Sequence, residues 1–547
     1  MRTAPAELLP LRATYEADGS AGASVAVEVR AAPTAGTLRV LHLGAVVREL
    51  PVTGDGVVDL GPLPPGGYGV DLIAPAGDRL TRTAVEVAGA TRTLRYGFVV
   101  DYRPGRDPAA VAENVRRLHL TDVQFYDWAY RHADLLGGGE VYDDALGQPI
   151  DLATVRALID ALHRVGARAL GYAAVYGVGN AEWPQWADAA LLTPSGEPYG
   201  LGDFLHLVDP AHPRWLAHFL ADLRAAAEQV GFDGFHLDQY GYPKLAVRPD
   251  ATDVRVQESF AALIEAARAA LPSARLVFNN VNDFPTWRTG GTPQDAVYVE
   301  VWPPHVTLGH LAAVATRARA AGGGKPVVVA AYQHVYDSAP VEEADRATAF
   351  TMATLFSHGA SQLLAGEADR ILVDPYYVRN HTVGGSTAAL LRRWYDFDVE
   401  HGELLRAPDG QDVTGALAGD YNDDCDVHYG DGSGVRLTET ATAGAVWRRI
   451  VATGPGLVVH LINLVQQDDT EWDAPRKPVA PVPGGTLRIR RVGDHDPRVR
   501  VADPDGTPTL VDLPVTLDGD HATVALPPLH VWQLVLVDLV PTPEESP

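Results

Sequence analysis

The first 95 residues carry short runs in which hydrophobic and polar side chains alternate. Ser24–Arg30 and Thr37–Leu41 are examples, and turns rich in glycine and proline follow at Gly54–Gly56 and Pro64–Gly67. Alternation with a period of two is typical of strands that bury one face, and closely spaced turns favour two packed sheets. We therefore expect an N-terminal immunoglobulin-like β-sandwich over residues 1–95, in which we find no motif that carries chemistry.

From residue 96 the pattern changes to near-continuous apolar runs that alternate with amphipathic helical stretches such as Leu152–Val165 and Arg214–Val230. Parallel strands that are covered on both faces have this pattern. Eight strands are predicted, at Tyr96–Asp101, Val123–Trp128, Ala167–Tyr176, Gly234–Gln239, Leu276–Asn280, Ala296–Val301, Pro326–Tyr332 and Ser361–Gly366. Eight strand–helix units in about 295 residues predict a central (β/α)8 TIM barrel over residues 96–397. A doubly wound sheet is less favoured, because no Gly-x-Gly-x-x-Gly follows the first strand.

Strand patterns return after a helix predicted around Thr387–Phe397. Gly456–Asn463, Thr486–Arg490 and Val531–Val537 are the clearest of these strands. They predict a C-terminal antiparallel β-sandwich over residues 398–547. The proline-rich segment Gln467–Gly485 is expected to be an irregular loop.

Composition narrows the possible partners. The 547 residues include 70 aspartates and glutamates against 44 lysines and arginines, a formal net charge of −26, which argues against nucleic acid and anionic membrane surfaces. No apolar run is long enough to span a bilayer, and Cys425 is the only cysteine, so an intrachain disulfide is excluded. The N-terminus lacks the apolar core of a secretion signal, which predicts a cytoplasmic protein, or a secreted one if a leader was removed.

Polar side chains lie at the ends of the predicted barrel strands, where the active sites of such barrels are found. They are Asp101, Asp127, Asp238, Asn279, Asn280, Glu300, Gln333 and Glu367. Asp238 and Glu300 stand out, because each ends an apolar strand that has aromatic residues beside it. Two such acids on one barrel face can cleave a glycosidic bond: one attacks or activates water while the other protonates the leaving oxygen.

Aromatic side chains are frequent at or just after the same strand ends. They are Trp128, Tyr176, Trp183, Trp186, Tyr240, Trp302, Tyr332 and Tyr336. Flat rings stack on the C–H faces of sugars, and their polar tips hydrogen-bond to sugar hydroxyls. Any one of them is more often part of a core, but together they favour a carbohydrate ligand.

Other reaction classes find less support in the sequence. There is no nucleophile elbow, no phosphate-binding loop and no His-Glu-x-x-His zinc motif. Acid–base cleavage of an acetal needs no redox partner, so we expect no cofactor and no catalytic metal. A structural calcium ion on the acidic segment Asp420–Asp426 is left open.

Several blocks between about residues 95 and 385 carry a family resemblance. They are Arg95–Phe98, Val123–His132, Gly171–Gly177, Gly231–Gly241, Val277–Asn282, Tyr298–Trp302, Ala330–Tyr332 and Leu355–Glu367. Gln-Phe-Tyr-Asp-Trp in the second block and Glu-Val-Trp in the sixth are distinctive. With these blocks the sequence resembles glycoside hydrolase family 66, the dextranases and cycloisomaltooligosaccharide glucanotransferases.

The resemblance implies a retaining mechanism on the α-1,6-glucosidic bonds of dextran or isomaltooligosaccharides. It also implies that Asp238 is the nucleophile and that Glu300 is the acid/base. We expect further contacts to the substrate from Asp127, Trp128, Tyr176, Tyr240, Asn280, Trp302, Tyr332 and Glu367.

Two alternatives to hydrolysis remain. The first is transglycosylation that makes cyclic isomaltooligosaccharides. It is disfavoured because enzymes of that type typically carry a carbohydrate-binding domain inserted into the barrel, for which about 295 residues leave no room. The second is a non-catalytic glucan-binding protein, which the presence of both carboxylates argues against.

Overall fold

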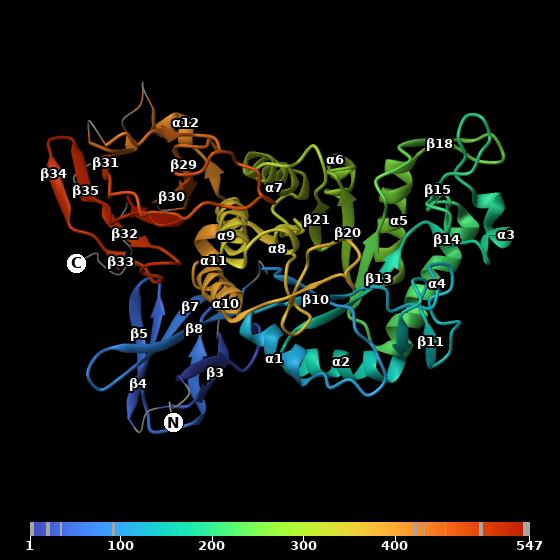
Figure 1. Cartoon of the computed structure of the whole chain (residues 1–547), viewed down its shortest axis with the longest axis horizontal. Helices are drawn as coiled ribbons and strands as arrows, with labels where there is room; N and C mark the ends of the chain where they lie inside the picture. The colour runs from blue at the N-terminus through green and yellow to red at the C-terminus, as the bar shows by residue number, and fades with distance from the viewer. Residues whose placement is uncertain are drawn as a thin grey trace.

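The structure is a computed structural model that describes residues 5–17, 22–32, 35–89, 93–419, 422, 424–430, 433–454, 456–491 and 496–539. A barrel occupies the right of Figure 1, with N-terminal sheets at the lower left and C-terminal sheets at the upper left. Each of the three regions has a hydrophobic core.

The barrel consists of eight parallel strands whose order in the sheet follows the chain. They are β9 (Tyr96–Val99), β10 (Asp122–Phe125), β13 (Arg168–Ala174), β17 (Gly234–Asp238), β20 (Arg275–Val281), β21 (Ala296–Glu300), β22 (Val327–Ala330) and β23 (Ala360–Gln362). Each overlaps one of the eight predicted strands, so the barrel prediction is confirmed. In a doubly wound sheet the order of the strands reverses at a switch point, whereas the strand order here follows the chain throughout.

Contacts between the first and last strands bring the barrel close to full closure. The backbone N–H of Phe98 donates to the carbonyl of Ala365 at 3.2 Å, and the hydroxyl of Ser361 donates to the carbonyl of Leu94 at 2.7 Å. We call this junction of β9 and β23 the seam.

Helices follow the strands and cover the outside of the barrel. They are α1 (Ala109–Arg117), α2 (Leu152–Arg164), α4 (Pro213–Val230), α5 (Val256–Ala270), α6 (Thr286–Thr289), α7 (Leu308–Gly322), α9 (Val341–Ser357) and α10 (Gly385–Glu400). The strand that carries Asp238 follows directly after α4. Gly231, with φ of +99°, ends that helix in the left-handed conformation, which favours glycine, and the chain turns into β17.

Additional short elements follow the carboxyl ends of the strands. They are β11 (Val141–Asp143) and β12 (Pro149–Asp151) after β10; β14 (Gly177–Gly179), α3 (Trp183–Trp186), β15 (Gly200–Leu201) and β16 (Leu205–Leu207) after β13; β18 (Leu245–Val247) and β19 (Asp253–Arg255) after β17; α8 (Val335–Ser338) after β22; and β24 (Arg370–Ile371) and β25 (His381–Thr382) after β23. This enlarged rim surrounds the end of the barrel where a site is expected.

Two N-terminal sheets share one core, as in a sandwich. The first is β1 (Glu7–Pro10), β3 (Ala23–Arg30) and β6 (Gly56–Leu63); the second is β2 (Tyr15–Glu16), β8 (Arg79–Ala88), β7 (Gly66–Ile73), β4 (Gly36–His42) and β5 (Ala45–Val52). Asp396 of α10 accepts hydrogen bonds from Thr83 and from the backbone N–H of Ala84, which fixes β8 against the barrel. Immunoglobulin-like topology and the predicted boundary at residue 95 remain predictions.

Two C-terminal sheets likewise share a core. The larger contains β26 (Gln411–Asp412), β28 (Leu437–Thr438), β29 (Val446–Thr453), β30 (Gly456–Asn463), β36 (Trp532–Asp538), β32 (Arg498–Ala502) and β33 (Val511–Asp512); the smaller contains β27 (Cys425–His428), β31 (Thr486–Arg490), β35 (His521–Ala525) and β34 (Val515–Asp518). The pairing is antiparallel except between β28 and β29. Trp532 stacks on Trp394 of α10, which joins these sheets to the barrel.

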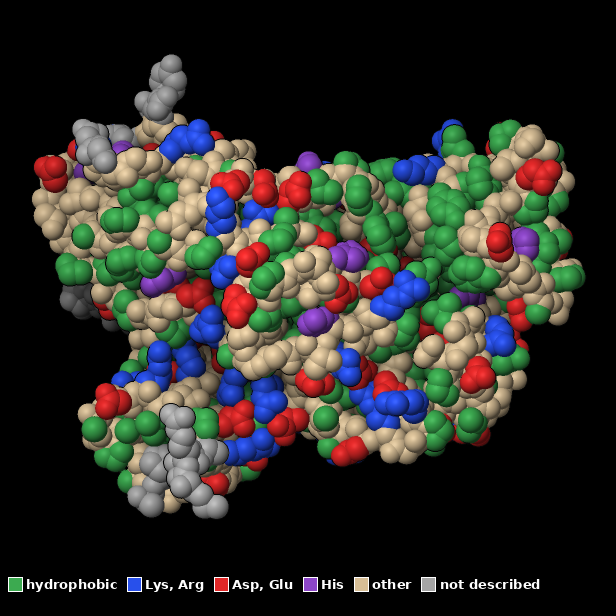
Figure 2. All heavy atoms as spheres, viewed as in Figure 1, with side chains coloured by type: hydrophobic (Ala, Val, Ile, Leu, Met, Phe, Trp, Pro, Cys, Tyr) green, Lys and Arg blue, Asp and Glu red, His purple; other side chains and the backbone are tan. Residues whose placement is uncertain are grey.

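The surface carries charges of both signs. On the face that Figure 2 shows, acidic and basic side chains are interspersed along the barrel and at its junction with the N-terminal sheets. Among the described residues, no helix combines the length and the apolar character that crossing a membrane requires.

Candidate active site

A cavity of about 280 Å³ lies at the carboxyl ends of the barrel strands. Asp238 ends β17 and Glu300 ends β21, and both side chains line it. The remaining lining residues are Gln124, Tyr126, Tyr172, Leu201, His236, Gln239, Tyr240, Asn279, Val281, Tyr298, Trp302, Tyr332, Pro375, Tyr376 and Tyr377. We call this space the catalytic cavity.

A single amide group connects the two carboxylates. The Nδ2 of Asn279 donates to Oδ1 of Asp238 at 2.7 Å and to Oε2 of Glu300 at 3.0 Å. The distance between Oδ1 of Asp238 and Oε2 of Glu300 therefore cannot exceed the sum of these two hydrogen-bond lengths. That limit is shorter than the about 6.5–9.5 Å between the carboxyl groups of inverting glycosidases.

Strand register explains why these side chains meet. Val281 pairs with Glu300 and Asn279 pairs with Tyr298 across β20 and β21. His236, two residues before Asp238, pairs with Val277, two residues before Asn279, across β17 and β20. Paired residues of parallel neighbours lie on the same side of the sheet, and residues two apart on one strand share a side. The inward side of three consecutive strands therefore carries Asp238, Asn279 and Glu300 together.

Tyrosine hydroxyls donate hydrogen bonds to the other oxygen of each carboxylate. Tyr172 donates to Oδ2 of Asp238 at 2.7 Å, and Tyr332 donates to Oε1 of Glu300 at 2.8 Å. Each carboxylate is thus held by two neutral donors in defined positions. This arrangement fixes the orientation of both groups without neutralising their charge.

The carboxyl groups have altered proton affinities. Burial raises the pKa of Asp238 and the nearby charge of Glu300 raises it further, to about 7, while burial also raises the pKa of Glu300. Hydrogen bonds from Asn279 lower both pKa values and so act against burial. Within the described residues no lysine or arginine forms an ion pair with either acid. The pair therefore loses its two protons in separate steps, between which it holds one proton.

His236 lies two residues before Asp238 and forms part of the cavity wall. Its Nδ1 lies 3.1 Å from the hydroxyl of Tyr96, and its ring stacks beside Tyr172 and meets Tyr298 edge to face. Burial lowers the pKa of His236 to about 3, so the imidazole is uncharged at neutral pH. It adds no positive charge to the pair.

Five of the predicted site residues line the catalytic cavity: Asp238, Tyr240, Glu300, Trp302 and Tyr332. Asp127 does not line it. Its side chain is 8% exposed at a backbone φ of +45°, and burial together with the charges of Asp144 and Asp238 raises its pKa. Asp127 is thus close enough to Asp238 for their charges to interact.

Three other predicted residues are buried away from the cavity. The indole N–H of Trp128 donates to the carbonyl of Tyr172 and its ring packs on Phe232, while the hydroxyl of Tyr176 donates to the carbonyl of Tyr242. Asn280 donates to backbone carbonyls and accepts from Thr289. All three are fully buried and do not line the catalytic cavity, and their expected contacts to the substrate remain predictions. For Asn280 the reason is strand alternation, which brings its neighbour Asn279 to the inward side.

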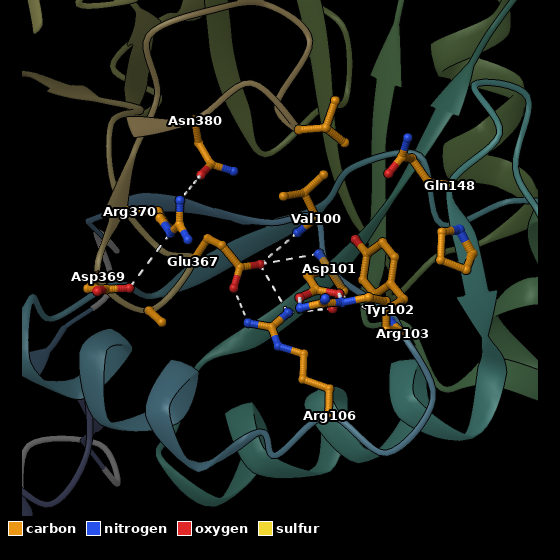
Figure 3. A pocket seen from close by; sticks show the side chains of 13 residues that line it. Val100, Asp101, Tyr102, Arg103, Arg106, Gln148, Glu367, Asp369, Arg370 and Asn380 are labelled. Carbon is orange, nitrogen blue, oxygen red and sulfur yellow. Dashed lines mark hydrogen bonds and ion pairs between the residues drawn. The ribbon is translucent and has the colours of Figure 1, made fainter. Parts of the chain in front are cut away.

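Glu367 lies in a different cavity. It accepts the backbone N–H groups of Val100 and Asp101 and is paired with Arg106 through both oxygens (Figure 3). It therefore connects the loops on the two sides of the seam and does not reach the Asp238–Glu300 pair.

Several cavity residues were not among the predicted contacts, notably Asn279, Tyr126, Tyr172, His236, Tyr298, Tyr376 and Tyr377. Strand alternation could have found His236 and Tyr298, which precede Asp238 and Glu300 by two positions. Tyr376 and Tyr377 come from the loop after β23, and no periodic signal places a loop against a barrel mouth.

Metal binding has no candidate among the residues that the structure describes, because no group of three or more His, Cys, Asp or Glu side chains is placed to hold an ion. The segment proposed for calcium, Asp420–Asp426, lies partly outside the described residues, which omit 420, 421 and 423.

Comparison with known proteins finds relatives with two named activities. A cycloisomaltooligosaccharide glucanotransferase of Niallia circulans is 27% identical over 307 residues, which are 50% of this chain and 32% of that protein. A dextranase of Streptococcus salivarius is 28% identical over 171 residues, which are 28% of this chain and 21% of that protein. The matched part of this chain thus spans about a third or less of each of these relatives.

A solved structure shares the whole architecture. The Paenibacillus sp. cycloisomaltooligosaccharide glucanotransferase complexed with cycloisomaltoheptaose superposes with a TM-score of 0.86 at 18% identity, covering 97% of this chain and 99% of that one. The sequence profile of glycosyl hydrolase family 66 matches residues 61–536, nearly the full length. The chain therefore belongs to glycosyl hydrolase family 66.

Proposed function

We propose that this protein is a retaining glycoside hydrolase that cleaves α-1,6-glucosidic bonds in dextran or isomaltooligosaccharides, as a dextranase does. The observation that carries this proposal is the pair of carboxylates joined by Asn279, whose amide nitrogen lies 2.7 and 3.0 Å from their facing oxygens, since this favours the closely spaced carboxyl groups of a retaining enzyme. Membership of family 66 and the dextranase relative support the substrate class.

In the first step Asp238 is the nucleophile. A carboxylate oxygen of Asp238 forms a bond to the anomeric carbon, and the bond from that carbon to the O6 oxygen of the neighbouring glucose breaks. Glu300 gives its proton to that leaving oxygen. Asn279 and Tyr172 hold the two oxygens of Asp238 and so fix the direction of attack.

In the second step the ester on Asp238 is hydrolysed. Glu300, now ionised, takes a proton from water, and the water oxygen bonds to the anomeric carbon while the ester bond breaks. Two inversions at one carbon restore the α configuration. Asp238 ends ionised and Glu300 protonated, as at the start.

The proton affinities of the pair suit this cycle. Burial and the proximity of two like charges keep one proton on the pair over the range in which an ordinary carboxyl group would be ionised. The form with Asp238 ionised and Glu300 protonated can begin the reaction. Activity should fall when the pair gains a second proton at low pH and when it loses its last proton at high pH.

The aromatic residues supply a surface for the sugar. Trp302 and Tyr332 lie beside Glu300 with their rings tilted at 60°, and Tyr126 stacks directly on Tyr377 in the cavity wall. Rings at such angles can contact more than one face of a glucose unit.

Transglycosylation to cyclic products is a second candidate, favoured by the Niallia and Paenibacillus relatives. It differs only in the second step, in which a hydroxyl of the glucan replaces water. The expectation that a cyclising enzyme needs a further inserted domain does not separate the two, because 99% of the Paenibacillus chain superposes on this one.

Product analysis tests the proposal. The protein is incubated with dextran and with isomaltooligosaccharides, the products are separated by chromatography, and their anomeric protons are followed by NMR. Linear products released first in the α form support hydrolysis with retention. Cyclic products support the second candidate. Products released first in the β form, or no products, contradict the proposal.

A further inference from the structure

A second and larger cavity of about 410 Å³ lies at the seam of the barrel. It opens among the loop after β9, the β11–β12 hairpin and the loops after β23 (Figure 3). Its lining residues are Val100, Asp101, Tyr102, Arg103, Arg106, Gln148, Pro149, Glu367, Ala368, Asp369, Arg370, Val378 and Asn380. We call it the seam cavity.

The charges of the seam cavity cancel. It is lined by three arginines and three carboxylates, and they are paired. Arg103 contacts both oxygens of Asp101 at 2.9 and 2.7 Å, and Arg106 is paired with Glu367. Arg370 lies 3.8 Å from Asp369. An anion would meet the carboxylates and a cation would meet the arginines, so neither finds a complementary field here.

Hydrogen-bonding capacity remains in spite of this pairing. The side-chain amide of Gln148 makes no hydrogen bond with any described residue, and the Arg103 side chain is 71% exposed. A guanidinium has five N–H donors, of which an ion pair to one carboxylate uses only part. The wall of the seam cavity therefore offers donors and acceptors without net charge, which suits a ligand rich in hydroxyl groups.

The seam cavity adjoins the catalytic cavity. Pro375, Tyr376 and Tyr377 line the catalytic cavity, and Val378 and Asn380, which follow them in the chain, line the seam cavity. A second link joins the strand ends. The hydroxyl of Tyr102, in the wall of the seam cavity, donates to the backbone carbonyl of Tyr126, in the wall of the catalytic cavity, at 3.1 Å. One loop thus separates the two spaces.

We propose that the seam cavity binds a part of the glucan chain that does not react, while another part of the same chain occupies the catalytic cavity. This inference rests on the proposed function, which supplies a neutral polyhydroxylated chain long enough to reach both cavities. Binding energy gained at a remote cavity can be used for the reaction of long substrates and is lost to short ones.

Steady-state kinetics with long and short substrates test whether the seam cavity binds glucan. The double variant Arg103→Ala/Gln148→Ala removes an exposed guanidinium and an unpaired amide, and neither residue touches the Asp238–Glu300 pair. We expect kcat/KM for dextran to fall about tenfold, as the loss of one or two hydrogen bonds implies, while that for nitrophenyl α-isomaltoside stays within about twofold. The control is Arg156→Ala, since Arg156 on α2 is paired with Glu140 and lines neither cavity. Equal kcat/KM in the double variant and the wild type on dextran would overturn the inference.

Hydrogen exchange gives a readout that does not depend on turnover. In the Asp238→Asn variant, isomaltoheptaose should protect amides at residues 100–106 and 367–370, segments that line the seam cavity and not the catalytic cavity, as well as those at 236–241, whereas isomaltose should protect only the latter. Protection confined to 236–241 with both sugars would overturn the seam-cavity inference and leave the proposed function standing. No protection in either region would contradict both.

Discussion

Two sets of carboxylates lie at the same end of the barrel but in opposite electrostatic surroundings. Asp238 and Glu300 face each other through a neutral amide and receive neutral tyrosine hydroxyls. Glu367, at the seam, is paired with the guanidinium of Arg106 and accepts two backbone N–H groups. Burial alone does not separate the two sets, because Glu300 and Glu367 are both buried.

The difference lies in the neighbouring cation. An arginine beside a buried carboxylate fixes its charge and makes it a structural element. A second carboxylate in place of the arginine raises the pKa, so that a proton can be held and given up near neutral pH. The seam acid therefore holds two loops together, and the central pair is suited to proton transfer. The following experiments test this contrast, beginning with the largest expected effect.

Replacing the proposed nucleophile should have the largest effect. Asp238→Asn keeps the shape of the side chain but removes the attacking oxygen, so turnover of dextran and of nitrophenyl α-isomaltoside should fall by at least about a thousandfold. Glu367→Gln is the matched control from the seam. It should keep turnover of the nitrophenyl substrate within a few-fold and lower the free energy of unfolding by about 3 kcal/mol, since it breaks a buried ion pair. Comparable activity losses in the two variants would contradict the contrast.

Replacing the proposed acid/base should separate the two chemical steps. Glu300→Gln cannot protonate a sugar leaving group, so activity on dextran should be lost. Nitrophenolate departs without a proton, and the first step should persist. We expect a burst of nitrophenol close to one per enzyme, followed by a slow phase.

Azide gives the control for this variant. It attacks without needing a base, so it should speed the slow phase and release a glycosyl azide of α configuration. Full activity of Glu300→Gln on dextran, or a burst in the Asp238→Asn variant instead, would reverse the assignment of the two roles.

Two adjacent asparagines allow a further test. Asn279 donates to both carboxylates and lowers both pKa values, so Asn279→Ala should shift both limbs of the pH–activity profile upwards and reduce kcat. Asn280→Ala removes buried hydrogen bonds of the framework, and should cost about 1–3 kcal/mol of stability without moving the profile. If both variants gave the wild-type pH profile, Asn279 would have no role in setting the proton affinities.

The smallest expected effect concerns stability against pH. The pKa of Asp238 is raised from 3.8 to about 7 in the folded protein, so the folded state holds this proton more tightly than the unfolded state does. Ionisation of Asp238 therefore costs stability as pH rises through this range, and the cost is absent below about pH 4. Asp238→Asn should melt at a higher temperature than the wild type at pH 8 and at nearly the same temperature at pH 4. If the melting temperatures of the variant and the wild type differed by the same amount at both pH values, the charge of Asp238 would not be the cause of the difference.

The barrel and its two acids could be predicted because both leave local signals. Each barrel strand is a continuous apolar run, and Asp238 and Glu300 end such runs. The sequence could not decide which of Asn279 and Asn280 lines the cavity, because this depends on which side of β20 faces inward, and a strand buried on both faces does not show this in its pattern. Register with β21 decides it.

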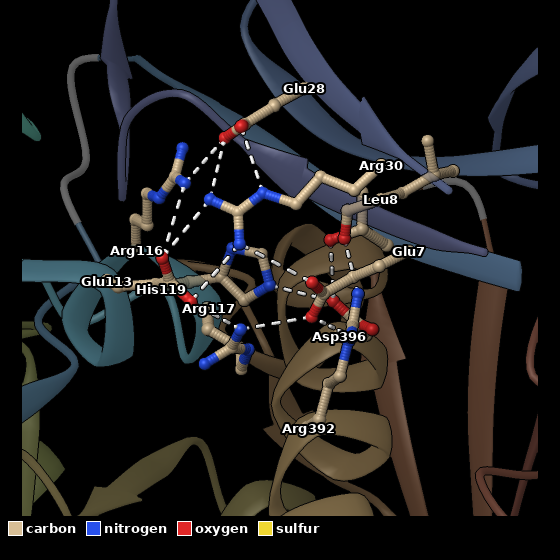
Figure 4. Close-up of polar contacts among 11 residues, drawn as sticks. Glu7, Leu8, Glu28, Arg30, Glu113, Arg116, Arg117, His119, Arg392 and Asp396 are labelled. Carbon is tan, nitrogen blue, oxygen red and sulfur yellow. Dashed lines mark hydrogen bonds and ion pairs between the residues drawn. The ribbon is translucent and has the colours of Figure 1, made fainter. Parts of the chain in front are cut away.

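Contacts between distant segments leave no local signal. Glu367 was expected at the sugar because it lies at the end of the last predicted barrel strand, but its partner Arg106 lies about 260 positions earlier and meets it only when the barrel closes. The same holds for the ionic cluster in Figure 4, in which Glu7 and Arg30 of the N-terminal sheets meet Arg117 of α1 and Arg392 of α10. The sequence shows an excess of acids and many arginines, but not which of them meet.

The most direct test of the central claim is to identify the residue that carries the glycosyl group. The wild-type enzyme is treated with an α-isomaltosyl fluoride that has a second fluorine at C5 of the reacting ring, which slows the second step, and is then digested and mapped by mass spectrometry. The account predicts one isomaltosyl ester per chain, on Asp238. An adduct on another residue, or cleavage with inversion and no adduct, would contradict it.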